Sequence, residues 1–366
     1  MSDFGTNVGE KFAKNVLGIF FQNAIAPDIT NQDYEGEIKG GGADRVNVLT
    51  FGALSLKPYS GSSMGTPDTP SESEGQLIVD QKKAYYFQIE SFAKFSSYVD
   101  NPESSLIQTA GKTLSETVDN FVLSFYSDVG AGNRVGTDYT TGTVAVANTT
   151  GAVTGTGTTF TAAMVGLGFK AAGHTEWYRV NTYTSATAIV IEDDKDDVTS
   201  AYTGGAISAG ATYTIEAVSA LAVTANSTNP IYSEVVALKT KLDQAKIPTS
   251  DRWLVMPAVV ANLLLSSNYL TPAVNTAYEN VVLKGILGYV AGFKVYSNEQ
   301  VSGDNTTGYY CLAGHKSFIT MAMAFTESEV EPFIGGFGQN FKGLNCYGAK
   351  VIDERRKAGA YLFCTV

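Results

Sequence analysis

A single apolar stripe through residues 101–126 predicts one long amphipathic helix. Asn101 is a suitable N-cap, Pro102 fits the first helical turn, and Glu103 complements the positive end of the helix dipole. The pattern stops before the glycines at 130 and 132. The apolar residues of the stripe recur at spacings of three and four: Leu106, Ala110, Leu114, Val118, Phe121 and Phe125.

The composition changes abruptly after this helix. From about Arg134 to Glu216, Thr, Gly, Ala and Val dominate, and short apolar runs are divided by Gly and Thr turns. This pattern is typical of a small β-sandwich or barrel. Helical patterns on both sides make residues 134–216 an inserted β-rich domain, in which Trp177 is expected in the core or at an interface. The short apolar runs of this domain include Thr143–Val146, Tyr178–Tyr183 and Thr187–Ile191.

Residues 1–42 are predicted to form an N-terminal arm. The arm carries one amphipathic patch that includes Phe12, Phe20 and Phe21, followed by Gly40-Gly41-Gly42. Because the arm is polar elsewhere, it needs a surface to become ordered. That surface is either the arm's own domain or a neighbouring subunit.

Two β segments follow within residues 43–95. The first, Arg45 to Leu56, and the second, Gln76 to Phe92, are separated by a loop rich in Gly, Ser, Pro and Thr. Two strands of about ten residues would form a ribbon about 30 Å long, and such a ribbon needs a surface to lie on. Tyr59, Tyr85 and Tyr86 are its interface candidates.

Helices and strands alternate irregularly from residue 217 onward. Ile231, Val235, Leu238 and Leu242 form a second amphipathic stripe that ends at Pro248. The absence of a βαβ rhythm predicts the α+β class. The further expected elements are a buried strand at Arg252–Met256, a helix from Pro257 through Leu265, a strand from Gly288 to Ser297, and short strands near Tyr309–Leu312, Lys350–Asp353 and Ala360–Thr365.

Charge and cysteine content restrict the function. The net charge is −11, and the only basic cluster, Arg355-Arg356-Lys357, follows two acidic residues, so sequence-specific nucleic-acid binding is not expected. Only 17% of residues are charged, which favours association with other protein surfaces. Three widely spaced cysteines and an N-terminus without a signal-peptide pattern predict folding in the cytoplasm.

Catalytic and ligand-binding templates are poorly matched. Asp193, Asp194, Asp196 and Asp197 could offer oxygens to a cation, but they lack the glycine turn and terminal glutamate of an EF-hand, and a solvated loop is the simpler interpretation. Cys311 and His315 suggest a Cys–His pair, although cysteine is usually buried. We therefore expect no catalytic residues, no cofactor and no enzymatic activity.

The order of these segments resembles that of the HK97-type major capsid proteins of tailed phages. Local matches are Leu242-Asp243-Gln244-Ala245-Lys246-Ile247-Pro248 followed by Asp251–Pro257, the Gly288–Asn298 stretch, and Asp33–Ile38 leading into the Arg45–Val48 strand. The resemblance covers residues 1–130 and 217–366. It implies an HK97-like fold in which 43–95 is the extended loop, 101–128 the spine helix within the core formed by 96–133 and 217–366, and 134–216 an insertion that faces outward or braces neighbours.

The resemblance also implies a function. It predicts a non-enzymatic subunit that assembles into hexamers and pentamers of an icosahedral head enclosing double-stranded DNA, in the virion and after assembly in the bacterial cytoplasm. A separate scaffolding protein, a portal and decoration proteins are expected partners, and a membrane is not. The alternatives are a tail or baseplate protein or an adhesin built around residues 134–216, and an enzyme with an unrecognised site.

Overall fold

A computed structural model describes residues 24–34, 45–51, 61, 72–90, 102–194, 201–267, 286–332 and 336–366. The chain divides into two units. The first contains Met1–Thr117 and Ile319–Glu354, and the second contains Val118–Phe318 and Arg355–Val366. Helix α5 (Pro102–Leu123) contributes residues to both. It confirms the predicted long helix and continues into the short 3₁₀ helix η1 (Ser124–Asp128).

The second unit is built on a mixed sheet with the order β13-β21-β18-β14-β16-β15. Strand β14 is parallel to β16 and antiparallel to β18, and β21 is antiparallel to β18. Helices and a mixed sheet in one core confirm the α+β class. The strands are β13 (Leu221–Ala222), β14 (Arg252–Met256), β15 (Ile286–Val290), β16 (Phe293–Ser297), β18 (Gly308–His315) and β21 (Gly359–Thr365), with β4 (Arg134–Val135) and β17 (Gly303–Asp304) at the margins.

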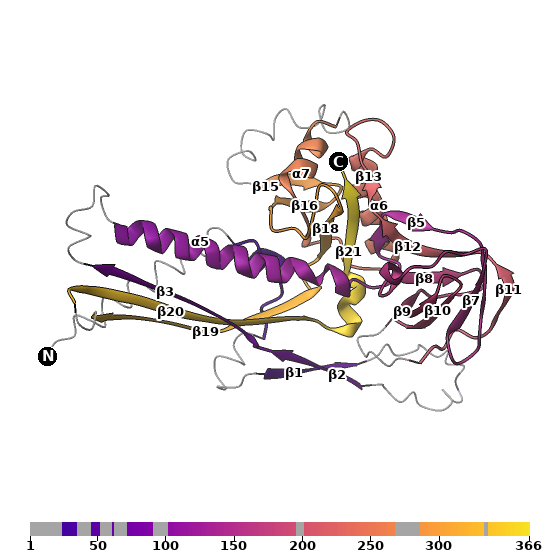
Figure 1. The fold of residues 1–366 in the computed structure, drawn as a ribbon, viewed down its shortest axis with the longest axis horizontal. Coiled ribbons are helices and arrows are strands. Elements are labelled where there is room, and N and C mark those ends of the chain that lie inside the picture. Colours follow the sequence, from indigo (N-terminus) through magenta and orange to yellow (C-terminus); the bar gives the residue numbers. More distant parts are fainter. Residues whose placement is uncertain are drawn as a thin grey trace. The chain divides into compact units, whose positions relative to one another are not determined.

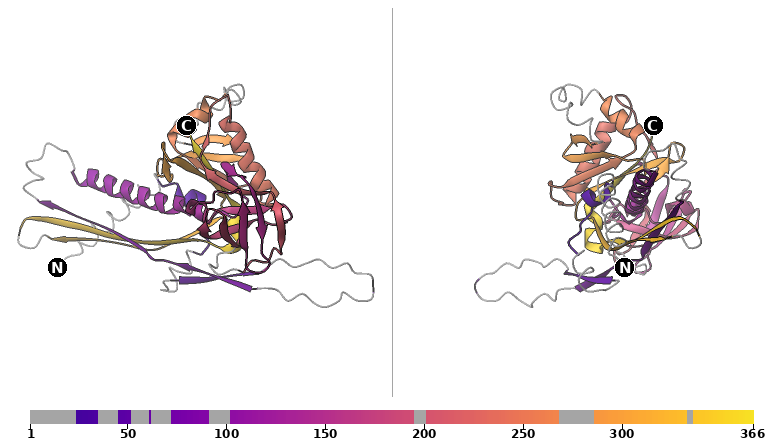
Figure 2. Two further views of the ribbon diagram at one scale, coloured as in Figure 1. Left: turned by 45° about the vertical axis from the view of Figure 1, so that its right-hand side comes forward. Right: turned by 90° about the vertical axis from the view of Figure 1, so that its left-hand side faces the viewer.

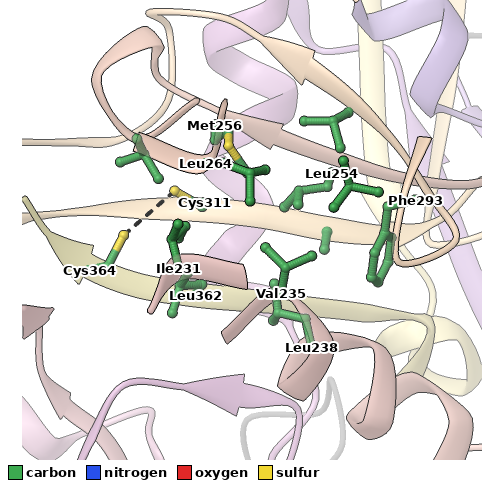
Figure 3. Packing of buried hydrophobic residues seen from close by; sticks show 14 of the residues in the cluster. Ile231, Val235, Leu238, Leu254, Met256, Leu264, Phe293, Cys311, Leu362 and Cys364 are labelled. Carbon is green, nitrogen blue, oxygen red and sulfur yellow. Dashed lines mark hydrogen bonds between the residues drawn. The ribbon is translucent and has the colours of Figure 1, made fainter. Parts of the chain in front are cut away.

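Two helices cover one face of this sheet. The apolar stripe of α6 (Ile231–Gln244) and the apolar helix α7 (Ala258–Leu265) pack on residues of β14, β16, β18 and β21 (Figure 3). Both helices start directly after a proline, Pro230 and Pro257, whose extended backbone serves as the N-cap. Each buried Leu, Ile or Val side chain stabilises the fold by roughly 1.5–3 kcal/mol.

Aromatic rings cover part of the other face. Tyr126 of η1 stacks on Tyr310 at 4.1 Å between ring centroids, and Tyr310 stacks on Phe363 at 4.3 Å. Close by in the sequence of α5, the buried Asp119 accepts a hydrogen bond of 2.9 Å from Asn298. The end of α5 is therefore fixed to the sheet by ring stacking and by a buried polar contact.

Strands β5 to β12 form a second sheet with the order β11-β6-β7-β10-β9-β8-β12-β5. It has its own apolar core, which includes Phe160, Phe169 and Ile215, and its strands stay together in both views of Figure 2. We call this part, Thr137–Ser219, the module. Its strands are β5 (Thr137–Tyr139), β6 (Thr143–Val146), β7 (Ala152–Thr156), β8 (Gly168–Ala171), β9 (Tyr178–Ser185), β10 (Ala188–Asp193), β11 (Ile207–Ala211) and β12 (Tyr213–Ser219).

The first unit contains two antiparallel sheets. Strands β1 (Arg45–Phe51) and β2 (Glu72–Ile78) form a hairpin with seven residue pairs in register. Strands β19 (Ile319–Pro332), β20 (Gly338–Val351) and β3 (Gln81–Glu90) form the other sheet, with β20 in the centre (Figure 1). The short helix α2 (Ala26–Ile29) leads to Asn31, which bridges to Thr320.

Two strand predictions are wrong in detail. The segment Gln76–Phe92 is two strands rather than one, and its second half, β3, pairs with β20 and not with the first segment. The segment Gly288–Ser297 is a hairpin, because Ala291 and Gly292 both have positive φ (49° and 88°) and turn the chain between β15 and β16. In addition, the long strand β19 was not predicted, and β20 extends far beyond the strand expected near Lys350.

Candidate functional site

The hairpin β1–β2 lies with one face on its own unit. Val46, Val48, Leu77 and Val79 are buried in a cluster with Ala322, Cys346 and Ile352, whereas the alternate residues Arg45, Asn47, Gln76 and Ile78 are exposed. A two-stranded ribbon is marginally stable alone, and burial of one apolar face against the rest of its unit stabilises it. Tyr59 lies between these strands and outside the described residues, as do Phe12, Phe20 and Phe21.

The sheet β19-β20-β3 presents two different faces. On one face Phe341 is buried, stacks on Phe87 at 5.2 Å and packs near Ile107 of α5. Tyr85 lies on the same face, half-buried and close above Gly343, and burial raises the pKa of its hydroxyl to about 12. Tyr86 lies on the opposite face and is 67% exposed. The two predicted interface candidates therefore have different surroundings.

The face of the sheet that carries Tyr86 is charged. Lys342 lies opposite Tyr86 in the register, and its ammonium group contacts Glu329 at 2.9 Å and Glu331 at 2.6 Å. These carboxylates hold the pKa of Lys342 above its usual range. Because all three side chains are well exposed, the pairs add little to folding stability. They instead give this face a defined charge pattern around one large aromatic ring.

The joint between the module and the core sheet contains a buried ion pair. Glu216 in the middle of β12 and Arg134 of β4 are both almost fully buried, with 3.6 Å between Oε1 and Nε. The backbone N–H of Gly132 donates to the same carboxylate at 2.8 Å. Burial raises the pKa of Glu216 to about 7, and Arg134 and the Gly132 N–H oppose that shift. The guanidinium of Arg134 also donates to the carbonyls of Val129 and Gly166.

Trp177 belongs to this joint. The ammonium groups of Lys170 in the module and Lys241 on α6 lie 5.8 Å and 5.6 Å from the centroid of its half-buried ring. Gly132 passes directly against the ring at a φ of 94°, where a Cβ atom would stand 2.5 Å from the indole. Trp177 thus makes extensive contacts within its own chain, and its predicted role at a subunit interface stays a prediction.

Two of the four aspartates of the predicted cation loop, Asp193 and Asp194, have structural partners. Asp193 accepts hydrogen bonds from the backbone and hydroxyl of Thr203. Asp194 accepts from the backbone of Ala131 at 2.6 Å and pairs with Arg356 at 3.2 Å. Asp196 and Asp197 lie outside the described residues. Within the described part of the chain no group of three acidic, His or Cys side chains is placed to hold a metal ion.

Cys311 and His315 do not come together. They are four residues apart on the same strand, β18, which separates them by about 13 Å. Cys311 is fully buried beside Cys364, with 3.9 Å between the sulfur atoms, and this contact and burial raise the pKa of its thiol well above the usual value. His315 Nδ1 contacts the hydroxyl of Ser317 at 2.8 Å. Each of the two residues therefore has its own contacts in the fold, and they do not form a Cys–His pair.

Arg252 explains why the Leu242–Pro257 segment carries a recognisable motif. Its buried guanidinium donates to the carbonyls of Ile247 (2.6 Å) and Pro248 (2.7 Å) and pairs with Asp243 at 2.8 Å. One side chain therefore closes the turn between α6 and β14. Lys246 at φ 58° and Asp251 at φ 51° supply the left-handed backbone that this turn requires.

Sequence reasoning missed Arg134, Glu216, Phe341 and Lys342. The signal available for Glu216 was its position as the only charged residue in the β12 strand. No comparable local signal exists for its partner, because their contact joins residues far apart in the chain. Among the described residues no helix is long and apolar enough to cross a membrane.

Comparisons with known proteins identify the family. The family model described as phage capsid protein matches residues 175–361, more than half of the chain. No curated protein matches the sequence. Among solved structures, a protein of Mycobacterium phage Che8 is 16% identical with a TM-score of 0.54, covering 92% of this chain and 89% of that one.

Two capsid structures are similarly related. The capsid of Ralstonia phage GP4 is 12% identical with a TM-score of 0.53, covering 95% of this chain and 90% of that chain. The capsid of cyanophage P-SCSP1u is 13% identical with a TM-score of 0.51, covering 92% and 85%. These similarities confirm the HK97-like fold. The chain belongs to the phage capsid protein family and is a major capsid protein, whose copies build the icosahedral head shell of a tailed phage.

Proposed function

We propose that this subunit acts purely as a building block, without enzymatic activity, and that its copies form the hexamers and pentamers of the head around double-stranded DNA. The match of the capsid family model to residues 175–361 is the observation that carries the proposal. The acidic chain, with 36 Asp and Glu against 25 Lys and Arg, suits a container that does not adhere to packed DNA.

In this proposal each consecutive segment of the chain has its own role in the shell. Residues 1–42 are the arm, 43–95 the extended loop, 96–133 and 217–366 the core, and 134–216 the insertion. In this proposal Phe12, Phe20, Phe21 and Tyr59 contact adjacent subunits. The exposed Tyr86, beside the Lys342–Glu329 pair, supports a further contact, since exposed aromatic rings with charged neighbours are common anchors of interfaces. Tyr85 and Trp177 are half-buried within their own chain, so only the exposed edges of their rings would contact an adjacent subunit.

The proposed partners extend beyond the chain itself. Assembly takes place in the bacterial cytoplasm with a separate scaffolding protein, and portal and decoration proteins complete the head. No membrane takes part. Cys311, Cys346 and Cys364 are all free and buried, which is compatible with folding in a reducing compartment. No specific observation favours a tail protein, an adhesin or an enzyme.

Deleting residues 58–71 tests the role of the extended loop. The deletion leaves all seven pairs of the β1–β2 hairpin, so the subunit should remain folded, as measured by circular dichroism and thermal unfolding. Electron microscopy should then show free subunits or capsomers in place of closed shells. Normal shells from the shortened chain would remove the loop from the assembly mechanism, and the absence of shells from the unmodified chain would contradict the proposal as a whole.

A further inference from the structure

His174 is a buried histidine in the turn that joins β8 to β9. Only 7% of its surface is exposed, although its neighbours Gly173 and Thr175 are both exposed. The ring packs edge-on against Tyr178 of β9, at 4.6 Å between centroids, and against Phe169 of β8, at 6.1 Å. Burial among aromatic rings makes the charged form of a histidine unfavourable.

Both nitrogen atoms of the His174 ring have partners. The backbone N–H of Ala171 donates to Nδ1 at 3.3 Å, so Nδ1 carries no proton. Nε2 lies 2.7 Å from the hydroxyl of Tyr202, and that hydroxyl donates its own proton to the carbonyl of Gly205 at 2.6 Å. The neutral ring therefore holds its proton on Nε2 and donates it to Tyr202. One chain of hydrogen bonds runs from Ala171 through His174 and Tyr202 to Gly205.

A second proton on the ring is incompatible with this chain of hydrogen bonds. An imidazolium has a donor at each nitrogen, so its Nδ1–H would face the N–H of Ala171 and neither group could accept. Because Ala171 is buried, its N–H would lose this acceptor away from water, which is unfavourable. The ring is rigid, so it cannot turn Nδ1 away from Ala171 and keep Nε2 on Tyr202. Protonation of His174 therefore also breaks the contact with Tyr202.

The charges around His174 also oppose a proton on its ring. Burial and, secondly, the ammonium group of Lys170 on β8 lower the pKa of His174 from its ordinary value of 6.5. Two acidic side chains act on the neighbouring Tyr178: after burial, Asp193 of β10 and Glu176 before β9 raise the pKa of its hydroxyl. Because both ring nitrogens of His174 are engaged, neither carboxylate pairs with it. By linkage, the contribution of His174 to stability is present above pH 6.5 and is lost as the pH falls below that value.

The segment that follows Tyr202 is held against the module by few contacts. Tyr202 packs on Tyr178 at 4.9 Å between ring centroids, and Gly204 lies directly against the hydroxyl of Tyr178. The backbone N–H and the hydroxyl of Thr203 donate to the carboxylate of Asp193. The hydrogen bonds from His174 to Tyr202 and from Tyr202 to Gly205 complete this set.

We propose that His174 is an acid-sensitive latch, which holds the segment 202–205 on the module while the ring is neutral and releases it when the ring is protonated. Through Asp193 the segment adjoins Asp194, which pairs with Arg356 of the core. Acid therefore loosens the module on the side that meets the core. The latch is a property of the single subunit, so its test does not depend on the shell function.

Histidine NMR of the unassembled subunit tests the protonation state directly, since the chain has only two histidines. At neutral pH, nitrogen spectra should show His174 with its proton on Nε2, and titration should give it a pKa below 6.5. His315→Gln removes the other histidine and so assigns the two sets of signals. A neutral ring protonated on Nδ1, or a pKa of 6.5 or above, overturns the proposal.

Hydrogen exchange measures the release of the segment. Between pH 7 and pH 5 the protection factors of the Ala171 and Thr203 amides should fall, with a limit of about tenfold for each unit by which the measured pKa of His174 lies below 6.5. In His174→Gln, which cannot gain a proton, they should change by less than about twofold. His315→Gln is the matched control and should keep the full loss. A local readout is needed because Glu216 shifts the stability of the whole subunit with pH in the opposite direction.

Tyr202→Phe tests the connection between the ring and the segment, and it keeps the proposal testable if His174→Gln does not fold. The variant retains an aromatic ring beside Tyr178 but lacks the hydroxyl that joins His174 to Gly205. The protection of Thr203 should already be reduced at pH 7 and should no longer change with pH. A pH response of Thr203 that stays unchanged in either variant overturns the proposal and assigns the response to another group.

Discussion

At the scale of single residues, Arg252 is the side chain that holds the turn between α6 and β14. Its buried guanidinium satisfies two backbone carbonyls and one carboxylate. Arg252→Ala would leave the carbonyls of Ile247 and Pro248 without these donors, which should lower the free energy of unfolding by about 2–4 kcal/mol. Urea unfolding of the unassembled subunit measures this loss.

Lys239 provides the matched control. It contacts the same carboxylate of Asp243 at 2.6 Å, but both side chains are more than a third exposed. Lys239→Ala should therefore change the free energy of unfolding by less than about 0.5 kcal/mol. Equal losses from the two variants would show that the charge on Asp243, and not the carbonyl contacts of Arg252, supports the turn.

Glu216 predicts a dependence of folding stability on pH. Its pKa rises from 4.5 to about 7 on folding, so between these values the folded chain holds a proton that the unfolded chain has released. By linkage, the contribution of Glu216 to stability is fully present below pH 4.5 and is lost as the pH rises through 7. The slope is at most about 1.4 kcal/mol per pH unit.

Glu216→Gln tests this assignment. The amide cannot ionise, yet its oxygen can still accept the Gly132 N–H. Thermal unfolding between pH 5 and 8 should show a smaller decline in the variant than in the unmodified protein. Identical pH profiles for the two proteins would show that the buried carboxylate does not titrate in this range.

At the scale of elements, the two faces of the β19-β20-β3 sheet predict opposite outcomes. Phe341 is 3% exposed and stacks on Phe87, so Phe341→Ala should destabilise the subunit by about 3–5 kcal/mol. Tyr86 is exposed on the other face, so Tyr86→Ala should leave subunit stability almost unchanged and reduce shell formation. Thermal unfolding and electron microscopy separate the two effects. A strong destabilisation by Tyr86→Ala would contradict the assignment of the faces.

Elements with local patterns could be predicted from the sequence. The apolar stripes of α5 and α6 and the apolar run of β14 can each be recognised from residues that are close together in the sequence. Strand β19 carries its Glu residues at alternate positions, 327, 329 and 331, which resembles a polar loop until its partner is known. Its sheet is completed by β3, more than two hundred residues earlier, and no local pattern encodes such a pairing.

The same limit applies to the candidate site. Trp177, Tyr85 and Tyr86 were recognisable as large aromatic residues in strand-like segments, but their surroundings were not. The faces of Tyr85 and Tyr86 depend on the register between β3 and β20. The surroundings of Trp177 depend on Lys241 from a different element. Residue type can therefore be read from the sequence, whereas burial and partners follow from contacts distant in the chain.

At the scale of the whole molecule, the module is inserted without interrupting the register of the core. Strand β4 runs parallel to β21, with Val135 opposite Leu362, and β13 continues along the same strand with Leu221 opposite Cys364. Only the position of Phe363 separates the two pairings. Gly136 can fill that position, so one residue suffices to join the two halves of the core after the module is removed.

Deleting Thr137–Ala220 should therefore leave a folded core. Arg134 loses Glu216 and the Gly166 carbonyl in this deletion, so Arg134→Ser is added to avoid a buried unpaired charge. The shortened chain should unfold cooperatively, and the separate fragment Thr137–Ser219 should fold on its own apolar core. Near-ultraviolet circular dichroism and calorimetry measure both. A shortened chain without fixed tertiary structure, beside a folded fragment, would show that the core depends on the module for its stability.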